Sequence, residues 1–351
     1  MLQPMHESDA AGQTVTLGQA KALIKAMAHR QSLLLLSPPG LGKTETVQTA
    51  ARECGLECRS LLGTQIAPED VSGVPRIIGE RSVFCPPRLL LPEGPSRPFL
   101  LFLDELPACN PDIQKAFYSL LLERRIGEFS LPEGTMVVAA GNRAEDRALV
   151  RTMSSALVNR VTILQVRLDR AEWLRWAVAS GVRREVRAFI HFTPDALSRP
   201  AAGGPNPFST PRAWAGLSEA MDLAEAAGIL DHSLVRALAF GRVSPEDAAV
   251  FSELYNHNLW ELGEPAGFIR DPGSLPKERV KLWFILDRVR RAVLDRSLAG
   301  AVSPDEVNRF LEAVPLEHRM TLMVDLLEGW ADLGANPTLL QTLGEVTGLW
   351  S

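Results

Sequence analysis

Three short apolar runs, uninterrupted by polar residues, stand out in the first half of the chain. They cover residues 33–36, 99–103 and 136–140. A short unbroken run of this kind is typical of a strand that is buried on both faces of a parallel sheet. Residues 113–123 instead carry apolar side chains at helical spacing. The pattern predicts an α/β fold in which helices lie on both faces of a parallel sheet.

The second half of the chain shows helical periodicity instead. Proline and glycine are frequent in residues 200–207, as in a linker, and Ser303-Pro304-Asp305-Glu306 is typical of a capped helix start. We therefore predict helical domains after the sheet. We find no motif with chemistry in residues 258–351, and we interpret their tryptophans as core or interface side chains. Apolar positions at helical spacing occur in residues 169–177, 183–192, 222–239, 282–298, 304–313 and 317–333.

A glycine loop, Ser37-Pro38-Pro39-Gly40-Leu41-Gly42-Lys43-Thr44, follows the first apolar run. Glycines allow several backbone N–H groups to converge on a phosphate, and the start of the next helix adds positive potential. In such a loop the lysine, here Lys43, reaches the β- and γ-phosphates, and the hydroxyl of Thr44 binds Mg²⁺. Ser37 replaces the first glycine of the usual pattern. The residues expected to bind the nucleotide are Pro39, Gly40, Leu41, Gly42, Lys43 and Thr44.

Polar side chains also end the other two apolar runs. Asp104 and Glu105 end the second, and Asn142 follows the third. The carboxyl ends of parallel strands meet at the edge where α/β sheets bind ligands. We expect Asp104 to bind the nucleotide's Mg²⁺ through water, Glu105 to polarise the attacking water, and Asn142 to orient that water. Taken alone, the carboxylates could be an exposed acidic pair and Asn142 a turn residue.

Together these motifs resemble, in order and spacing, the Walker A, Walker B and sensor-1 motifs of the AAA+ ATPases, and within them of the MoxR family. Pro68-Glu69-Asp70-Val71-Ser72-Gly73 also looks like that family's P-x-D-hydrophobic-x-G segment. In similar proteins it precedes a hairpin inserted into the second helix, here residues 75–89 with a turn at Gly79-Glu80. The resemblance covers about residues 15–257. It implies a P-loop AAA+ sheet sandwiched by helices, ATP and Mg²⁺ as cofactors, and ATP hydrolysis.

By the same resemblance, Arg160 is the arginine finger, which reaches the nucleotide of the neighbouring subunit. Such an arginine neutralises charge on the γ-phosphoryl oxygens in the transition state. Val161 departs from the phenylalanine usual after this arginine. Arg124 occupies the position of a subunit-interface arginine, a role that the adjacent Arg125 could equally serve.

Ser209-Thr210-Pro211-Arg212 resembles the family's sensor-2 motif at the start of a lid helix. Proline suits the first helical position, and Thr210 is the expected cap. Arg212 is then expected to contact the γ-phosphate. A surface arginine on a solvated helix face remains the alternative for Arg212, and a surface arginine likewise for Arg160.

The resemblance implies an AAA+ α/β nucleotide-binding core in residues 1–167, a helical lid with sensor 2 in residues 168–257, and a helical C-terminal extension in residues 258–351. It also implies a homo-oligomeric ring, expected to be a hexamer. Similar proteins remodel, mature or activate a protein client, commonly with a von Willebrand factor A domain partner. In relatives a short hairpin, expected here at residues 126–133, faces the central pore.

The charge composition of the chain bears on whether it binds nucleic acid. The net charge is −5, and no block of Lys and Arg exceeds two residues. A nucleic-acid motor usually shows a basic stripe, because phosphate neutralisation supplies much of its affinity. We therefore expect no nucleic-acid partner, although Arg76, Arg81 and Arg88 lie in or near the inserted hairpin.

The chain also lacks the sequence features of membrane and zinc proteins. No apolar run reaches the length of a membrane span, and residues 1–9 lack the pattern of an export signal. We therefore expect a cytoplasmic protein without membrane insertion. The four cysteines and six histidines show no paired zinc-ligand spacing apart from Cys54 and Cys58, so we expect no zinc site.

Two other functions stay open on sequence grounds. One is a nucleic-acid-dependent nucleoside triphosphatase of a defence or mobile-element system, since related AAA+ ATPases act in this way. The other is a non-hydrolysing scaffold gated by nucleotide, which the intact Lys43, Asp104, Glu105 and Asn142 disfavour. The residues do not distinguish ATP from GTP, because base contacts in this fold come from variable apolar residues and backbone groups.

Overall fold

The computed structural model describes residues 13–88, 90–91, 97–126, 129–143, 158–199, 206–294, 298, 300–315, 318–319 and 322. The chain divides into two compact units. The first comprises Met1–Val182, Asp195–Glu219 and Arg242–Ser244, and the second Arg183–Pro194, Ala220–Gly241 and Pro245–Ser351. The domain boundaries expected after residues 167 and 257 stay predictions.

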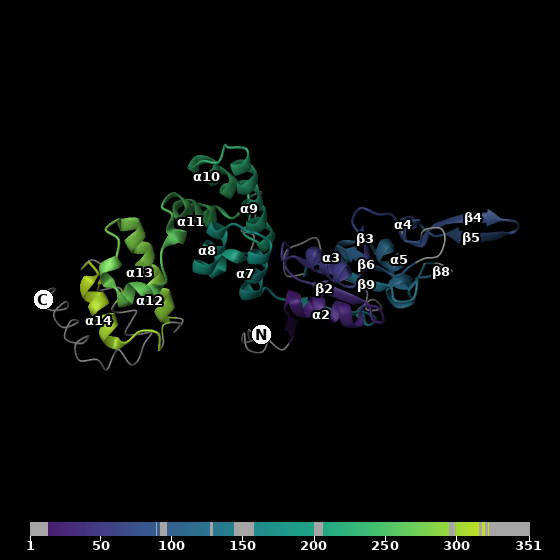
Figure 1. Ribbon diagram of the computed structural model, residues 1–351. Helices are drawn as coiled ribbons and strands as arrows, with labels where there is room; N and C mark the ends of the chain where they lie inside the picture. Colours follow the sequence, from purple (N-terminus) through teal and green to yellow (C-terminus); the bar gives the residue numbers. More distant parts are fainter. Residues whose placement is uncertain are drawn as a thin grey trace, which may run out of the picture. The chain divides into compact units, whose positions relative to one another are not determined.

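A six-stranded parallel sheet forms the centre of the first unit (Figure 1), in the order β1-β10-β2-β9-β6-β3. Strands β2, β6 and β9 are the three apolar runs, and they are neighbours in the middle of the sheet, which confirms the predicted parallel sheet. The strands are β1 Thr14–Val15, β2 Leu33–Leu36, β3 Glu57–Leu62, β6 Phe99–Asp104, β9 Met136–Gly141 and β10 Thr162–Val166.

Helices cover both faces of this sheet. Leu33 and Leu35 of β2 pack in one core with residues of α2 (Leu17–Met27) and α3 (Lys43–Glu53). Leu34 and Leu36 pack in a second core with residues of α5 (Pro111–Leu122). Successive strand side chains point to opposite faces, so a strand covered on both sides must be apolar throughout. This is why the unbroken runs correctly predict buried strands.

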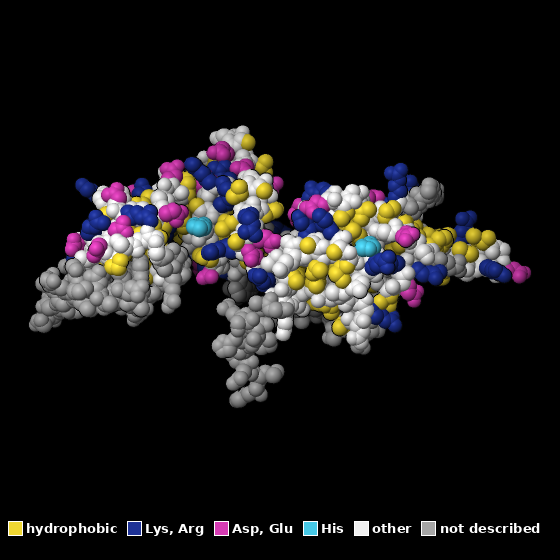
Figure 2. All heavy atoms as spheres, turned by 60° about the horizontal axis from the view of Figure 1, so that its bottom comes forward, with side chains coloured by type: hydrophobic (Ala, Val, Ile, Leu, Met, Phe, Trp, Pro, Cys, Tyr) yellow, Lys and Arg dark blue, Asp and Glu magenta, His cyan; other side chains and the backbone are white. Residues whose placement is uncertain are grey.

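Two β-hairpins extend from this unit. Strand β4 (Val74–Ile78) pairs antiparallel with β5 (Arg81–Cys85) after the short helix α4 (Glu69–Ser72), and Gly79 turns with a φ of 65°. The predicted inserted hairpin and its turn are therefore confirmed. Strand β7 (Arg125–Ile126) pairs with β8 (Phe129–Ser130), as expected for the second, shorter hairpin. Figure 2 shows apolar side chains beside arginines on the β4–β5 hairpin at the right of the view.

The remaining described elements are helical. In the second unit Phe268, Ile285 and Phe310, from α12, α13 and α14, belong to one hydrophobic core. The parts of the predicted helices that fall in residues 295–297, 317, 320–321 and 323–333 lie outside the described residues. Among the residues that are described, no helix is long and apolar enough to cross a membrane. The helices are α7 Arg170–Ala179, α8 Arg184–Phe192, α9 Pro211–Ala226, α10 His232–Phe240, α11 Pro245–Asn256, α12 Pro265–Arg270, α13 Arg279–Leu294 and α14 Pro304–Ala313, with 3₁₀ turns η1 Leu106–Ala108, η3 Pro194–Leu197, η4 Leu259–Glu261 and η5 Pro272–Ser274.

Trp214 of α9 anchors this helix in the first unit. Its side chain is fully buried, and its indole N–H donates to the backbone oxygen of Ala196 at 2.6 Å. We expect Trp214→Ala to lower the free energy of unfolding by about 3–5 kcal/mol, because it leaves a large cavity and an unpaired carbonyl. Urea unfolding followed by circular dichroism measures this change. The matched variant Trp283→Ala, at a position 60% exposed, is expected to cost less than about 1 kcal/mol, and equal losses would contradict the prediction.

Candidate functional site

The glycine loop leaves the carboxyl end of β2 and enters α3 at Lys43. Gly40 and Gly42 have φ values of 73° and 114°, which favour glycine. A Cβ atom on Gly40 would also lie 2.6 Å from Oγ1 of Thr210. The two glycines are therefore required by backbone conformation, and Gly40 also by the close approach of the segment before α9.

Lys43 is buried beside this loop. Its Nζ atom donates to Oγ of Ser37 at 2.9 Å, to the backbone oxygens of Ser37 and Pro38 at 3.2 and 3.3 Å, and to Oδ1 of Asn142 at 3.2 Å. The ammonium group thus lies between the glycine loop and the end of β9. The structure brings together Lys43 and Asn142, which the sequence placed in one site.

Thr44 and Asp104 lie side by side at the same edge. Oγ1 of Thr44 donates to Oδ2 of Asp104 at 3.1 Å, and Oδ1 of Asp104 accepts from the backbone N–H of Glu105 at 2.9 Å. Hydroxyl and carboxylate oxygens are the donors that Mg²⁺ prefers. The pair is therefore chemically suited to hold Mg²⁺ directly or through water, as expected from the sequence.

Glu105 follows Asp104 in a left-handed conformation, with a φ of 58°. A non-glycine residue there stores strain, which is typical of functional sites. Its Oε2 atom accepts from Oγ1 of Thr64 at 2.5 Å. Burial, and then the carboxylate of Glu105, raise the pKa of the Cys109 thiol to about 11, so this cysteine stays protonated near neutral pH. No local sequence pattern marks Thr64, which follows the carboxyl end of β3, and only the strand order brings it to Glu105.

The ends of β6 and β9 approach each other closely. A Cβ atom on Gly141 would lie 2.2 Å from Cδ of Pro107, which follows Asp104 and Glu105 in the chain. A larger residue at position 141 would therefore push Asn142 away from Asp104 and Glu105. The glycine before Asn142 was visible in the sequence, but its contact with Pro107 was not.

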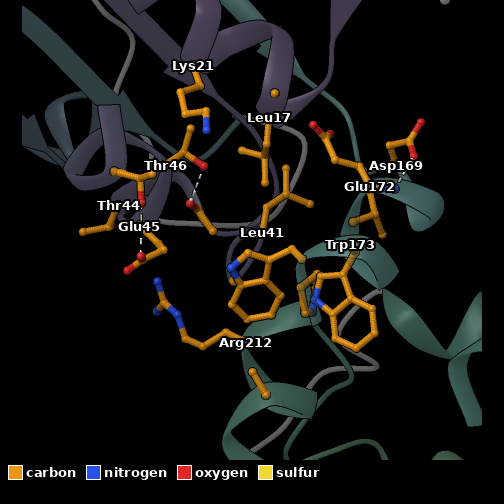
Figure 3. Close-up of a pocket in the computed structure, with 18 of the residues that line it drawn as sticks. Leu17, Lys21, Leu41, Thr44, Glu45, Thr46, Asp169, Glu172, Trp173 and Arg212 are labelled. Atoms are coloured by element: carbon orange, nitrogen blue, oxygen red, sulfur yellow. Dashed lines mark hydrogen bonds between the residues drawn. The ribbon is translucent and has the colours of Figure 1, made fainter. Parts of the chain in front are cut away.

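A pocket of about 700 Å³ opens beside the glycine loop (Figure 3). Gly40, Leu41, Gly42 and Thr44 line one side, and Arg212 of α9 lines it from another. The backbone N–H of Arg212 donates to the oxygen of Gly40 at 3.0 Å, and Thr210 caps α9 through the N–H of Ala213 at 3.1 Å. The predicted cap is therefore confirmed, and Arg212 lies at the loop as expected for a sensor-2 arginine.

The pocket also has an apolar wall that no motif in the sequence indicates. Leu17 at the start of α2, Leu168 and Trp173 line it. Trp173 of α7 is 94% buried and shares this pocket with the glycine loop, whereas helical periodicity alone assigns such a side chain to a core. An apolar wall next to a glycine loop of this kind is suited to the apolar part of a small ligand such as a nucleoside.

Arg160 lies at the amino end of the parallel strands, whereas the glycine loop lies at their carboxyl end. It stands two residues before Thr162, which pairs with Leu33, whereas Ser37 lies four residues after Leu33. About six residues at roughly 3.3 Å each, or about 20 Å, separate Arg160 from the glycine loop along the strand direction. The side chain is exposed and lines a separate recess of about 320 Å³ with Arg30. The structure therefore does not bring Arg160 to the glycine loop of its own chain.

Arg124 is engaged within its own chain. Its guanidinium donates to the backbone oxygen of Ala28 at 2.7 Å and to that of Thr135. The residue is half-buried in a left-handed conformation, and burial lowers the pKa of its guanidinium. These bonds favour a structural role, which ties α2 to the start of β9. The adjacent Arg125 is exposed.

Comparison with known proteins identifies the domain. Residues 33–166 match the model of the AAA family, ATPases associated with various cellular activities. Over 122 residues the chain is 30% identical to the Holliday junction branch migration complex subunit RuvB of Treponema pallidum and to that of Treponema denticola, covering 33% of this chain. The chain spans 30% and 31% of the length of these curated relatives.

Solved structures show weaker similarity. A mutant of Thermotoga maritima RuvB is 18% identical, with a TM-score of 0.41 and coverage of 89% of this chain and 86% of that one. A putative ATPase from Cytophaga hutchinsonii is 16% identical, with a TM-score of 0.36 and coverage of 70% and 83%. With TM-scores of this size, the residues of one site cannot be superposed on those of another. The family match and the parallel sheet with its glycine loop agree, and residues 33–166 are therefore an AAA ATPase domain with the P-loop fold.

Proposed function

We propose that this protein hydrolyses ATP in a ring in which Arg160 of one subunit completes the nucleotide site of the next. The proposal rests on the position of Arg160, which is exposed about 20 Å from its own glycine loop. An arginine side chain cannot span that distance, whereas a second copy can present Arg160 to a neighbour's γ-phosphate. An arginine supplied in this way accelerates phosphoryl transfer by about 10³–10⁵-fold.

The residues around the glycine loop are suited to different roles in ATP hydrolysis. Lys43 exchanges its contacts with the loop for the β- and γ-phosphates, while Thr44 and Asp104 hold Mg²⁺. When bound, Mg²⁺ supplies positive charge to the phosphate oxygens. Glu105 accepts the proton of the attacking water. Asn142 orients that water, and Arg212 contacts the γ-phosphate from α9.

The dependence of ATPase activity on protein concentration tests the shared site. We expect the specific activity of the native chain to rise with concentration, because the complete site forms only on assembly. Arg160→Ala is expected to lower it by about 10³-fold or more without loss of ATP binding. A flat concentration profile together with an active variant would contradict the ring.

Mixing two inactive variants sharpens the test. Arg160→Ala retains its glycine loop, and Lys43→Ala retains its arginine. In a mixture, Lys43→Ala can supply Arg160 to the loop of the other variant, so we expect partial recovery of activity. If each site instead used its own arginine, no mixture would recover activity.

For the client, we propose that the ring is MoxR-like, expected to be a hexamer, and remodels, matures or activates a protein together with a von Willebrand factor A domain partner. The segment of residues 68–73 and the β4–β5 hairpin that follows it support this family assignment. Affinity purification of the Glu105→Gln variant tests it. Recovery of a von Willebrand factor A domain protein would support the assignment, and recovery of nucleic acid without one would count against it.

A nucleic-acid-dependent ATPase is the second candidate. Arg76, Arg81 and Arg88 are exposed in or beside the β4–β5 hairpin, and the relatives named above are branch migration subunits. ATPase measurements with and without duplex or single-stranded DNA discriminate between the candidates. Stimulation that disappears in an Arg76→Ala, Arg81→Ala double variant would favour this second function.

A further inference from the structure

We infer that Ser37 is a positioning residue whose hydroxyl holds the ammonium group of Lys43 in the nucleotide-free site and thereby weakens nucleotide binding. This role rests on the proposed ATP site. Ser37 stands where the usual loop pattern has its first glycine. The hydroxyl is therefore a feature of this chain's own sequence, added to a loop that otherwise carries the expected residues.

The backbone at position 37 does not require a glycine. Ser37 is absent from the residues with positive φ, in contrast to Gly40 and Gly42 of the same loop. Its side chain is fully buried. A serine therefore fits without backbone strain, and a buried hydroxyl needs hydrogen-bond partners within the loop.

Both sides of the hydroxyl are used. Oγ of Ser37 donates its proton to the backbone oxygen of Pro38 at 2.9 Å, so its lone pairs remain to accept from Nζ of Lys43, also at 2.9 Å. This is the shortest of the four contacts that Nζ makes with Ser37, Pro38 and Asn142. The donated proton fixes the orientation in which the hydroxyl is an acceptor.

Nucleotide must compete with these contacts. An ammonium group has three N–H donors, and the four oxygen contacts already engage them in the structure. To bind the β- and γ-phosphates, Lys43 must release part of this set. An interaction made only in the free state lowers the affinity for the ligand by the corresponding factor. The hydroxyl of Ser37 adds such an interaction, which glycine or alanine would not.

Nucleotide affinity of the full chain tests this role. We expect Ser37→Ala to bind ADP and ATP more tightly than the native chain, by about 10-fold or more, since a hydrogen bond to a charged group is lost from the free state alone. Ser37→Thr retains a hydroxyl and is expected to stay nearer the native affinity. Titration with a fluorescent ADP analogue, with ATP as competitor, gives both values.

The controls separate positioning from folding. Ser252→Ala removes another buried hydroxyl, which donates to the oxygen of Ala248 at 2.7 Å in α11, and is expected to leave nucleotide affinity unchanged. Loss of a merely structural contact would loosen the loop and weaken binding, so tighter binding is not a result of damage. If Ser37→Ala does not fold, Ser37→Gly removes the same hydroxyl and is expected to tighten binding as well.

The possible results distinguish the role of Ser37 from the proposed ATP site itself. Weaker or unchanged affinity in a folded Ser37→Ala chain would overturn the role of Ser37 and leave the ATP site intact. A native chain that binds neither ADP nor ATP would overturn the proposed function and this role together. Tighter binding in Ser37→Ala, with native-like affinity in Ser37→Thr, would support it.

Discussion

Replacing Glu105 by glutamine is expected to lower ATP turnover by about 10²–10⁴-fold while ATP binding is retained. The amide keeps the size of the side chain but cannot accept a proton from the attacking water, and general-base catalysis contributes a factor of this order. Glutamine can adopt the same left-handed backbone conformation as Glu105, and its amide oxygen can still accept a hydrogen bond from Thr64. Steady-state phosphate release and a separate ATP titration measure the two quantities.

The same variant reports on assembly. Because bound ATP is not consumed, we expect Glu105→Gln to accumulate as an assembled form in ATP, which size-exclusion chromatography detects. Glu133→Gln, an exposed glutamate before β9, is the matched control and is expected to retain native turnover. Native turnover in Glu105→Gln would show that another group activates the water.

The second large effect is expected for Lys43→Ala, which should lower kcat/KM for ATP by at least about 10²-fold through loss of binding. Lys43 is the buried cation between the glycine loop and Asn142, and charge-assisted hydrogen bonds contribute about 1.5–3 kcal/mol each. Two such bonds to phosphate correspond to a factor of 10² or more. Titration with a fluorescent ATP analogue distinguishes a binding defect from a turnover defect.

Lys115→Ala serves as its control. This lysine lies on α5 with a side chain that is 69% exposed and pairs with Asp112 at 3.1 Å. Surface pairs of this kind contribute little, so activity and stability should stay close to native. ATP binding that survives in Lys43→Ala would require the phosphates to lie elsewhere than on the glycine loop.

Local sequence pattern predicted the sheet and most of the site. The runs at β2, β6 and β9 are apolar at every position because helices cover both faces of the sheet. This requirement is therefore visible in the local sequence. In a parallel sheet the carboxyl ends of such strands share one edge. The convergence of Lys43, Asp104 and Asn142 followed from these two facts, before any strand order was known.

Strand order and register decided the rest. Thr64 contacts Glu105 because β3 lies beside β6, and the glycine at 141 is needed because β9 lies against Pro107. Neither neighbour is close in sequence. Residues far apart along the chain leave no mark on local periodicity, so no pattern of apolar and polar positions could have found these contacts.

The three arginines show most clearly which features the sequence predicts and which depend on tertiary structure. Family resemblance named Arg124, Arg160 and Arg212, but the sequence contained nothing to tell an arginine at the loop from one at the far edge of the sheet. Parallel pairing of β10 with β2 puts Arg160 about 20 Å from the glycine loop, packing brings Arg212 to it, and Arg124 is held by two backbone oxygens. The sequence by itself determined which strands are buried and which polar groups end them, because burial constrains each residue locally. Which charged side chains share an edge was decided only by tertiary structure, because it depends on the order in which distant strands pair.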